Sequence, residues 1–279
     1  MSRYVSWAKL NSVLFSAILI LSLIGLEKPS YAFRPSFSYR RYSIFREEVA
    51  MFNLKFYYGY NFSNYSASSQ TGLIDTNFGA NNYNLGGSFL FTFGRGSKWG
   101  ADLTAGLQSL QVLGATYPIR NESAKLVYIW SLPKKRPKMI NMFKLGYGHK
   151  GFVEFEATGP RSANTRYASL WGPTAEVTSS ILIEKITWID FGGSIFYPTS
   201  ATVDQFPGAV NQSPISYEAF AGITMGFTPY FALGVTGFIH NQKLQYEVNY
   251  PTADGRPPNK VNSSSLSGEG ALISVQFSY

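Results

Sequence analysis

The sequence predicts an all-β protein: a transmembrane, antiparallel, up-and-down β-barrel of ten strands. From residue 51 onward, apolar residues alternate with polar or small ones in segment after segment. This is the pattern of strands with lipid on one face and a polar interior on the other. Charged residues make up only 14% of the chain, against roughly 25% in soluble domains, and aromatic residues make up 16%. Few charges and many aromatic side chains suit a protein that is surrounded by lipid.

A helical membrane protein is excluded by run length. Past residue 32, no apolar run approaches the roughly 20 residues that a helical span needs. Because only helices and closed barrels satisfy every backbone polar group in hydrocarbon, a barrel is the remaining architecture. The net charge of +8 is basic, but the cations are scattered over turns and loops. We therefore expect no nucleic-acid partner.

Residues 1–32 are typical of a secretory signal peptide. Arg3 and Lys9 precede a mostly apolar run over 13–26, and small residues surround an expected cleavage site after Ala32. A permanent membrane anchor is the alternative, although the run is short for one. The chain contains no cysteine, which excludes a lipoprotein and any disulfide.

Five strands are expected in the first half of the barrel domain, which spans residues 51–279. Each has one apolar face and one polar or glycine-rich face, and tight turns follow several of them. They are 51–64, 80–93, 99–113, 121–132 and 139–155, and their outward faces include Phe52, Tyr83, Trp99, Leu126 and Phe143 respectively.

Five more strands complete the predicted ring by the same alternation. The histidine at 240 has inward parity and the one at 149 outward parity, whereas Trp188 has inward parity in an otherwise regular strand. The strands are 172–183, 186–197, 214–227, 230–243 and 271–279, and their outward faces include Ala175, Ile189, Ile215, Phe231 and Ala271 respectively.

The connections alternate between short and long, which places both ends of the barrel on the same side of the membrane. The short turns 94–98, 133–138, 184–185 and 228–229 are expected in the periplasm, as in single-chain bacterial barrels. Twelve strands are the alternative, with the extra pair taken from 33–50 or from a long loop. The long segments, expected to be extracellular loops, are 65–79, 114–120, 156–171, 198–213 and 244–264.

The last nine residues carry a resemblance to a known class. The apolar face of this segment is formed by Ala271, Ile273, Val275, Phe277 and Tyr279. It resembles the C-terminal signal strand of bacterial outer-membrane β-barrels, although the final residue there is more often Phe. The resemblance implies the bacterial outer membrane as location, with outer-membrane lipid, lipopolysaccharide, and the export and barrel assembly machinery as partners. No motif indicates a subfamily.

Residues 33–50 combine four arginines with several aromatic residues. We favour a periplasmic leader for this segment. The alternative is a segment that enters the lumen or contacts a periplasmic partner.

The expected interior contains charges of both signs. A ten-stranded barrel is nearly filled by its own side chains, so an open general porin is not expected. The mixed charges are explained either as an internal network or as a path for a small polar solute. The expected lumen-lining residues are Lys55, Asp102, Lys125, Lys144, Glu176, Asp190 and Glu218.

No arrangement of residues supports catalysis. One family of ten-stranded outer-membrane proteases works through carboxylates and a histidine, but neither His149 nor His240 lies in an Asp-His pair or beside a plausible serine. We expect no enzyme, no cofactor and no metal site. The sequence therefore predicts a narrow channel or a structural surface protein. The alternative is an adhesin or receptor that uses the loops 198–213 and 244–264, and a surface hydrolase is the least favoured function.

Overall fold

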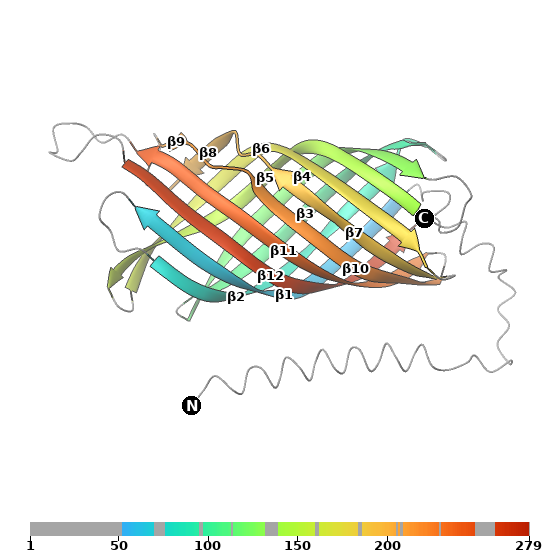
Figure 1. Ribbon diagram of the computed structural model, residues 1–279, viewed down its shortest axis with the longest axis horizontal. Coiled ribbons are helices and arrows are strands. Elements are labelled where there is room, and N and C mark those ends of the chain that lie inside the picture. Colours follow the sequence, from blue (N-terminus) through green and yellow to red (C-terminus); the bar gives the residue numbers. More distant parts are fainter. Residues whose placement is uncertain are drawn as a thin grey trace, which may run out of the picture. The chain divides into compact units, whose positions relative to one another are not determined.

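The structure is a computed structural model that describes residues 52–69, 76–94, 97–112, 114–131, 139–159, 162–183, 186–204, 206, 209–228, 230–248 and 260–278 (Figure 1). The predicted signal peptide, the predicted leader 33–50 and Tyr279 lie outside these residues. Within the described part of the chain, no helix is long and apolar enough to cross a membrane.

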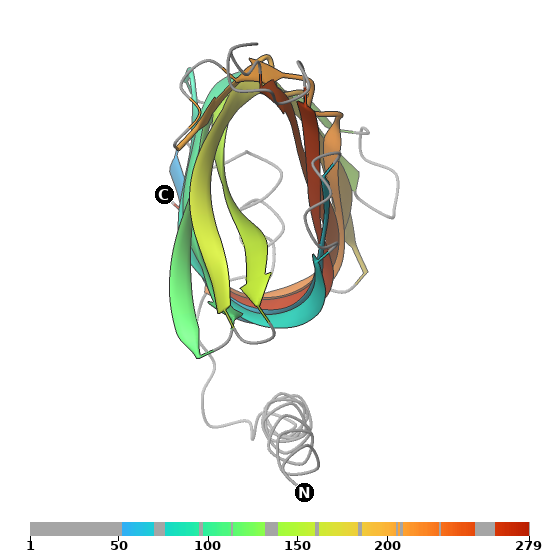
Figure 2. The same ribbon diagram turned by 90° about the vertical axis from the view of Figure 1, so that its left-hand side faces the viewer.

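Ten antiparallel strands form a closed ring, which confirms the predicted fold class and strand number (Figure 2). Each strand pairs with its neighbours in the chain, and the first pairs with the last to close the ring. The strands are β1 (Phe52–Ser69), β2 (Thr76–Thr92), β3 (Trp99–Val112), β4 (Ala115–Ser131), β5 (Met139–Gly159), β6 (Ser162–Leu182), β7 (Thr187–Phe196), β10 (Ser216–Thr228), β11 (Phe231–Val248) and β12 (Lys260–Ser278).

Two short strands lie in the connection between β7 and β10, in the range expected to be a loop at 198–213. β8 (Ser200–Val203) pairs with β6, and β9 (Val210–Asn211) pairs with β11. Along β6, β8 continues the ladder that β7 makes, and along β11, β9 continues the ladder of β10, so the two short strands lengthen the wall and leave the ring at ten strands.

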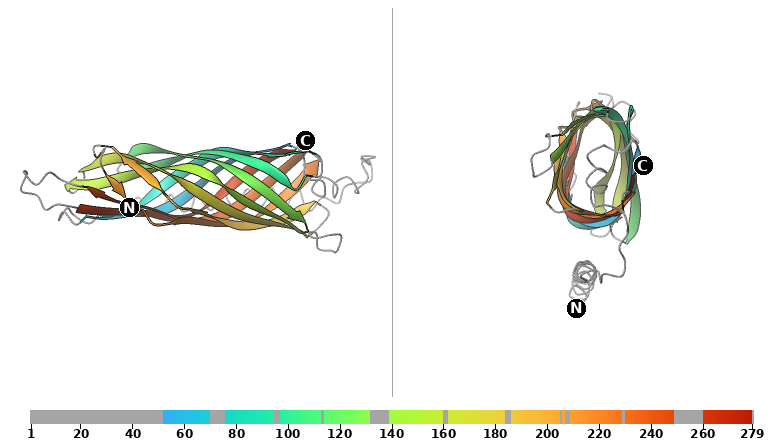
Figure 3. Two further views of the ribbon diagram at one scale, coloured as in Figure 1. Left: turned by 90° about the horizontal axis from the view of Figure 1, so that it is seen from above. Right: turned by 90° about the vertical axis from the view of Figure 1, so that its right-hand side faces the viewer.

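Several strands are much longer than predicted. Most of 65–79, 114–120 and 156–171 is strand rather than loop, as are 244–248 and 260–264, and the last strand begins at Lys260 instead of residue 271. At about 3.3 Å per residue and a tilt of roughly 40°, the 18 residues of β1 rise about 45 Å. The apolar band of such barrels is only about 25 Å tall. The wall therefore continues well past the membrane, and the oblique course of the strands is visible in Figure 3.

The sequence did not predict the full length of these strands because the polarity of their two faces reverses along the strand. Near the membrane the outward side chains are apolar and the inward ones polar. Farther along β1, however, Tyr65 is buried inside while Ser66 faces outward, and in β11 Tyr246 is buried while Lys243 is exposed. Strands whose outward side chains are polar and whose inward side chains are apolar therefore resemble a polar loop in sequence.

A belt of exposed apolar side chains surrounds the middle of the ring. Leu145 is the most exposed of these at 68%, and aromatic residues border the belt on both sides. On one border Phe52, Phe89 and Phe91 contact one another, with ring centroids 5.7 to 6.0 Å apart. We call this the terminal end of the barrel, because β1 begins there and β12 finishes there, and we call the opposite end the far end.

Two apolar clusters lie inside the barrel. The larger one fills the far end and includes Tyr65, Phe152, Phe155 and Tyr246. The smaller one lies nearer the terminal end, where Trp188 packs inward on residues of β4 and β5. The inward parity of Trp188 therefore reflects internal packing and not a shifted register.

A lipid-facing charge provides a test of the belt. Leu145→Arg should lower the free energy of unfolding by about 2–4 kcal/mol, because its side chain lies in the apolar band. Gln111→Arg is the matched control, since Gln111 is an exposed outward residue beyond the belt, and it should change stability by less than about 1 kcal/mol. Urea unfolding in lipid vesicles measures both. Equal losses in the two variants would contradict the placement of the belt.

Candidate functional site

A cavity of about 420 Å³ occupies the barrel interior. Its lining comes from all ten strands of the ring. Asn53 and Ser278 line it at the terminal end, and Phe196 and Gln242 line it toward the far end. All seven residues that the sequence predicts as lumen-lining belong to this lining, namely Lys55, Asp102, Lys125, Lys144, Glu176, Asp190 and Glu218.

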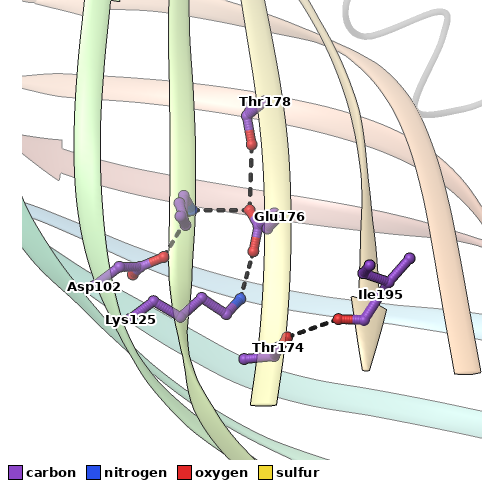
Figure 4. A network of polar contacts seen from close by, with 7 residues as sticks. Asp102, Lys125, Thr174, Glu176, Thr178 and Ile195 are labelled. Atoms are coloured by element: carbon purple, nitrogen blue, oxygen red, sulfur yellow. Dashed lines mark hydrogen bonds and ion pairs between the residues drawn. The ribbon is translucent and has the colours of Figure 1, made fainter. Parts of the chain in front are cut away.

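Four of these residues form a compact ion cluster on neighbouring strands (Figure 4). The Lys125 Nζ lies 2.5 Å from Glu176 Oε2. The Lys144 Nζ lies 2.7 Å from Asp102 Oδ2 and 2.8 Å from Glu176 Oε1. Antiparallel register produces this arrangement, because Asp102 is opposite Lys125 across β3 and β4, and Lys144 is opposite Glu176 across β5 and β6. Two cations and two carboxylates therefore compensate each other within the wall of the cavity.

Asp190 is held by two hydroxyl groups from the strands on either side of β7. Ser180 donates from β6 and Thr224 donates from β10, each at 2.5 Å. Oxygen-to-oxygen hydrogen bonds to a carboxylate are the short, charge-assisted kind.

The far end of the cavity is covered by the extension of β5 and β6, which we call the mouth hairpin: residues 151–159 with 162–169. The pairing of β4 with β5 ends at Asn121 and Lys150, and beyond that point β5 pairs only with β6. Residues 151–155 are all buried. A strand with both faces buried does not lie in a barrel wall that has solvent or lipid outside.

Contacts with the opposite wall place this part of β5 in the lumen. The Phe155 backbone N–H donates to the Tyr65 hydroxyl of β1 at 2.8 Å, and the Gln242 side chain of β11 donates to the Gly151 carbonyl at 2.7 Å. The Phe155 ring also makes edge contacts with Phe78 of β2 and Tyr117 of β4, with centroids 5.2 and 5.1 Å apart. The mouth hairpin therefore closes the far end with a packed aromatic layer.

Glu154 lies within this layer and is fully partnered. The Tyr246 hydroxyl donates to its Oε2 at 2.5 Å, the Ser264 hydroxyl donates to its Oε1 at 3.1 Å, and Arg166 lies 3.5 Å away. Burial, then the charge of Glu154, raises the pKa of the Tyr246 hydroxyl well above its usual range, so this group stays a donor. The sequence reading missed Glu154 and Tyr246 as a pair, and only the unbroken inward parity of β11 past residue 243 would have indicated it.

Three further polar residues line the cavity below the mouth hairpin. The Lys150 Nζ lies 5.4 Å from the centroid of the Phe196 ring, and Lys150 makes no ion pair with any described residue. Glu218 likewise has no hydrogen bond or ion pair among the described residues, and the Nε2 of His240 is buried without a hydrogen-bond partner there. His149, by contrast, contacts the exposed Trp171, with ring centroids 4.6 Å apart and the ring planes tilted by 40°.

The described residues contain no group of three or more His, Cys, Asp or Glu side chains arranged to hold a metal ion. The electrostatic neighbour of the His240 ring is Lys150, which lines the same cavity.

Removing one charge tests whether the ion cluster stabilises the protein. Lys144→Met should destabilise the protein by about 3 kcal/mol, because it leaves Asp102 and Glu176 sharing one buried cation. The double variant Lys144→Met with Asp102→Asn restores the charge balance and should lose less than the single variant. Urea unfolding in vesicles measures both, with the exposed Lys243→Met as a control that should stay within about 0.5 kcal/mol of the wild type. A single variant as stable as the control would contradict the compensated cluster.

No protein-family model matches the chain, and no curated protein matches it in sequence. Solved structures are similar at low identity. The outer-membrane protease OmpT of Escherichia coli matches over 82% of this chain and 96% of its own, with 10% identity and a TM-score of 0.47. The NanC porin matches over 81% and 100%, with 10% identity and a TM-score of 0.35. The translocator domain of the autotransporter NalP from Neisseria meningitidis matches over 86% and 93%, with 8% identity and a TM-score of 0.37.

A protease, a porin and a translocator domain differ in activity, so these similarities assign none of these activities to this chain. The fold class is assigned from the structure of this chain. Its ring of ten strands is closed, its belt is apolar and rimmed by aromatic residues, and its interior at the level of the belt is polar. The chain therefore has the fold of a transmembrane β-barrel, the architecture that outer-membrane barrel proteins share.

Proposed function

We propose that this protein is a narrow conduit for small polar solutes in the bacterial outer membrane, held closed at its outer mouth by the mouth hairpin. In this proposal the terminal end, where the first strand begins and the last strand finishes, faces the periplasm, and the far end, where the wall extends beyond the belt, faces outward. The supporting observation is the polar cavity, which is lined from Asn53 and Ser278 at the terminal end up to the underside of the hairpin. A purely structural barrel has no need of such a space.

The pairing of the strands supports a hairpin that moves without opening the ring. Past Lys150, β5 has no ladder hydrogen bonds with β4, while β4 stays paired with β3 as far as Ala115. Moving the hairpin outward would leave β3 and β4 paired, but it would displace or unpair β8, which pairs with Ala168 and Ser169 of the hairpin. The contacts to be broken include the buried rings of Phe152 and Phe155 and the hydrogen bonds of Glu154, so the closed state is favoured at rest.

A second function, a non-conducting surface protein, is favoured by the same packed layer. A mouth filled by aromatic side chains and a fully partnered Glu154 also suits a permanently closed barrel. The two functions differ in what happens when the hairpin is loosened.

Planar-bilayer conductance of the refolded protein distinguishes them. The wild type should be silent or open rarely. Phe152→Asn with Phe155→Asn should give stepwise conductance, because two buried polar amides disfavour packing of the hairpin against β1 and β2. Phe143→Asn with Leu145→Asn is the matched control, since the same kind of change on the lipid-facing side of β5 leaves the hairpin in place.

A cross-link provides the reverse experiment. The chain has no cysteine, so Glu154→Cys with Ser264→Cys introduces a unique pair at positions whose side chains touch in the closed state. Bridging the pair with a short bifunctional thiol reagent should abolish conductance in the loosened background, and cleavage of the bridge should restore it. A loosened variant that folds into vesicles and stays silent would establish the non-conducting surface protein instead.

A further inference from the structure

The charged groups of the interior are unequally partnered. Asp102 and Glu176 contact lysines, Glu154 contacts Arg166 and Tyr246, and Asp190 accepts two hydroxyl hydrogen bonds. Glu218 is different, since it has no hydrogen bond or ion pair among the described residues. A buried or half-buried carboxylate without a partner costs free energy, so it marks a place where an external cation is favoured.

The complementary charge lies in the same part of the cavity. Lys150 is the last residue of β5 that pairs with β4, and its ammonium group lies 5.4 Å from the centroid of the Phe196 ring and forms no ion pair with a described residue. Lys150 and Glu218 both line the cavity, yet they form no ion pair with each other. Two opposite charges that share a cavity but remain apart leave room for a molecule between them.

Adjacent side chains add hydrogen-bonding and apolar contacts. Glu218 and His240 are direct partners across β10 and β11 and both face inward. The Nε2 of His240 has no hydrogen-bond partner among the described residues, and the His240 ring stacks on Phe238 with centroids 5.8 Å apart. Phe196, Phe220 and Phe238 also line the cavity. The volume of about 420 Å³ is within the range of small-molecule sites.

We infer that this part of the cavity is a binding site for a small zwitterion, with a carboxylate on Lys150 and an ammonium group on Glu218. A zwitterion neutralises both side chains at once, whereas a simple anion or cation leaves one of them unpaired. Charge-assisted hydrogen bonds of this kind are the strong ones in a site shielded from bulk water. The inference names the solute class for the conduit proposed above and to that extent rests on it, but binding is measurable without conduction.

The test is isothermal titration of the full protein, folded in lipid nanodiscs, with ω-amino acids of increasing length: glycine, β-alanine, 4-aminobutyrate and 6-aminohexanoate. Two-point binding should give an affinity optimum at one chain length. At that length, the matched half-ligands, an alkyl carboxylate and an alkylammonium ion, should bind about tenfold more weakly or worse. Affinities that do not depend on chain length, or half-ligands that bind as well as the zwitterion, would overturn the inference.

Single variants test which side chain binds each end of the ligand. Glu218→Gln should abolish the advantage of the zwitterion over the carboxylate, and Lys150→Met should abolish its advantage over the ammonium ion. The exchange Lys150→Glu with Glu218→Lys keeps the charge balance and should retain binding, which guards against loss of fold in the single variants. Lys243→Met and Glu269→Gln are the matched controls, because both residues are exposed on the outside of the wall.

The outcomes separate this inference from the conduit. Zwitterion binding in a protein that stays silent in every conductance experiment would leave the site standing and refute the conduit. Conductance in the loosened variant without any zwitterion preference would support the conduit and refute the binding site. Unchanged binding in Glu218→Gln would refute the site whatever the conductance shows.

Discussion

The pairing of β1 with β12 is the contact on which the rest of the structure depends. It runs without interruption from Asn53 opposite Ser278 to Ser69 opposite Asn262. By closing the sheet, it removes the edges that lipid cannot solvate and gives every strand a fixed inner and outer face. Because side chains alternate strictly along a strand, one correct register places every other residue of ten strands in a single shared interior. The ion cluster and the cavity are direct consequences of that closure.

Parity is also the reason that part of the site was predictable from sequence alone. The inward positions of Asp102, Lys125, Lys144 and Glu176 follow from alternation within each strand, and no knowledge of their partners is needed. Which of them would touch was not predictable. That depends on the stagger between strands, since Lys144 reaches both Asp102 and Glu176 from a strand that is adjacent to only one of theirs.

The far end was mispredicted for a physical reason. Alternation identifies a strand but does not say which face is in water, and beyond the belt the outer face becomes polar while the inner face becomes apolar. Turn chemistry contributed, because Gly114 adopts a positive φ of 83° and allows β3 to turn directly into β4, where a loop had been expected. The entry of residues 151–155 into the lumen was beyond local pattern altogether, since it is specified by contacts with β1, β2 and β11.

The closure and the proposed binding site meet at one position of the chain. Lys150 is the last residue of β5 held in the wall, and Gly151, already hydrogen-bonded to Gln242 across the lumen, is the first residue of the mouth hairpin. A ligand bound to the Lys150 ammonium therefore contacts the wall at the hinge and lies directly beneath the closing layer. Lys150 belongs to the proposed binding site and also adjoins the base of the hairpin. Ligand binding and the position of the hairpin are therefore coupled by as much as the affinity of the ligand differs between the two positions. That coupling is reciprocal: a solute that binds better when the hairpin is displaced also favours the displacement, and a solute that prefers the closed state holds the barrel shut.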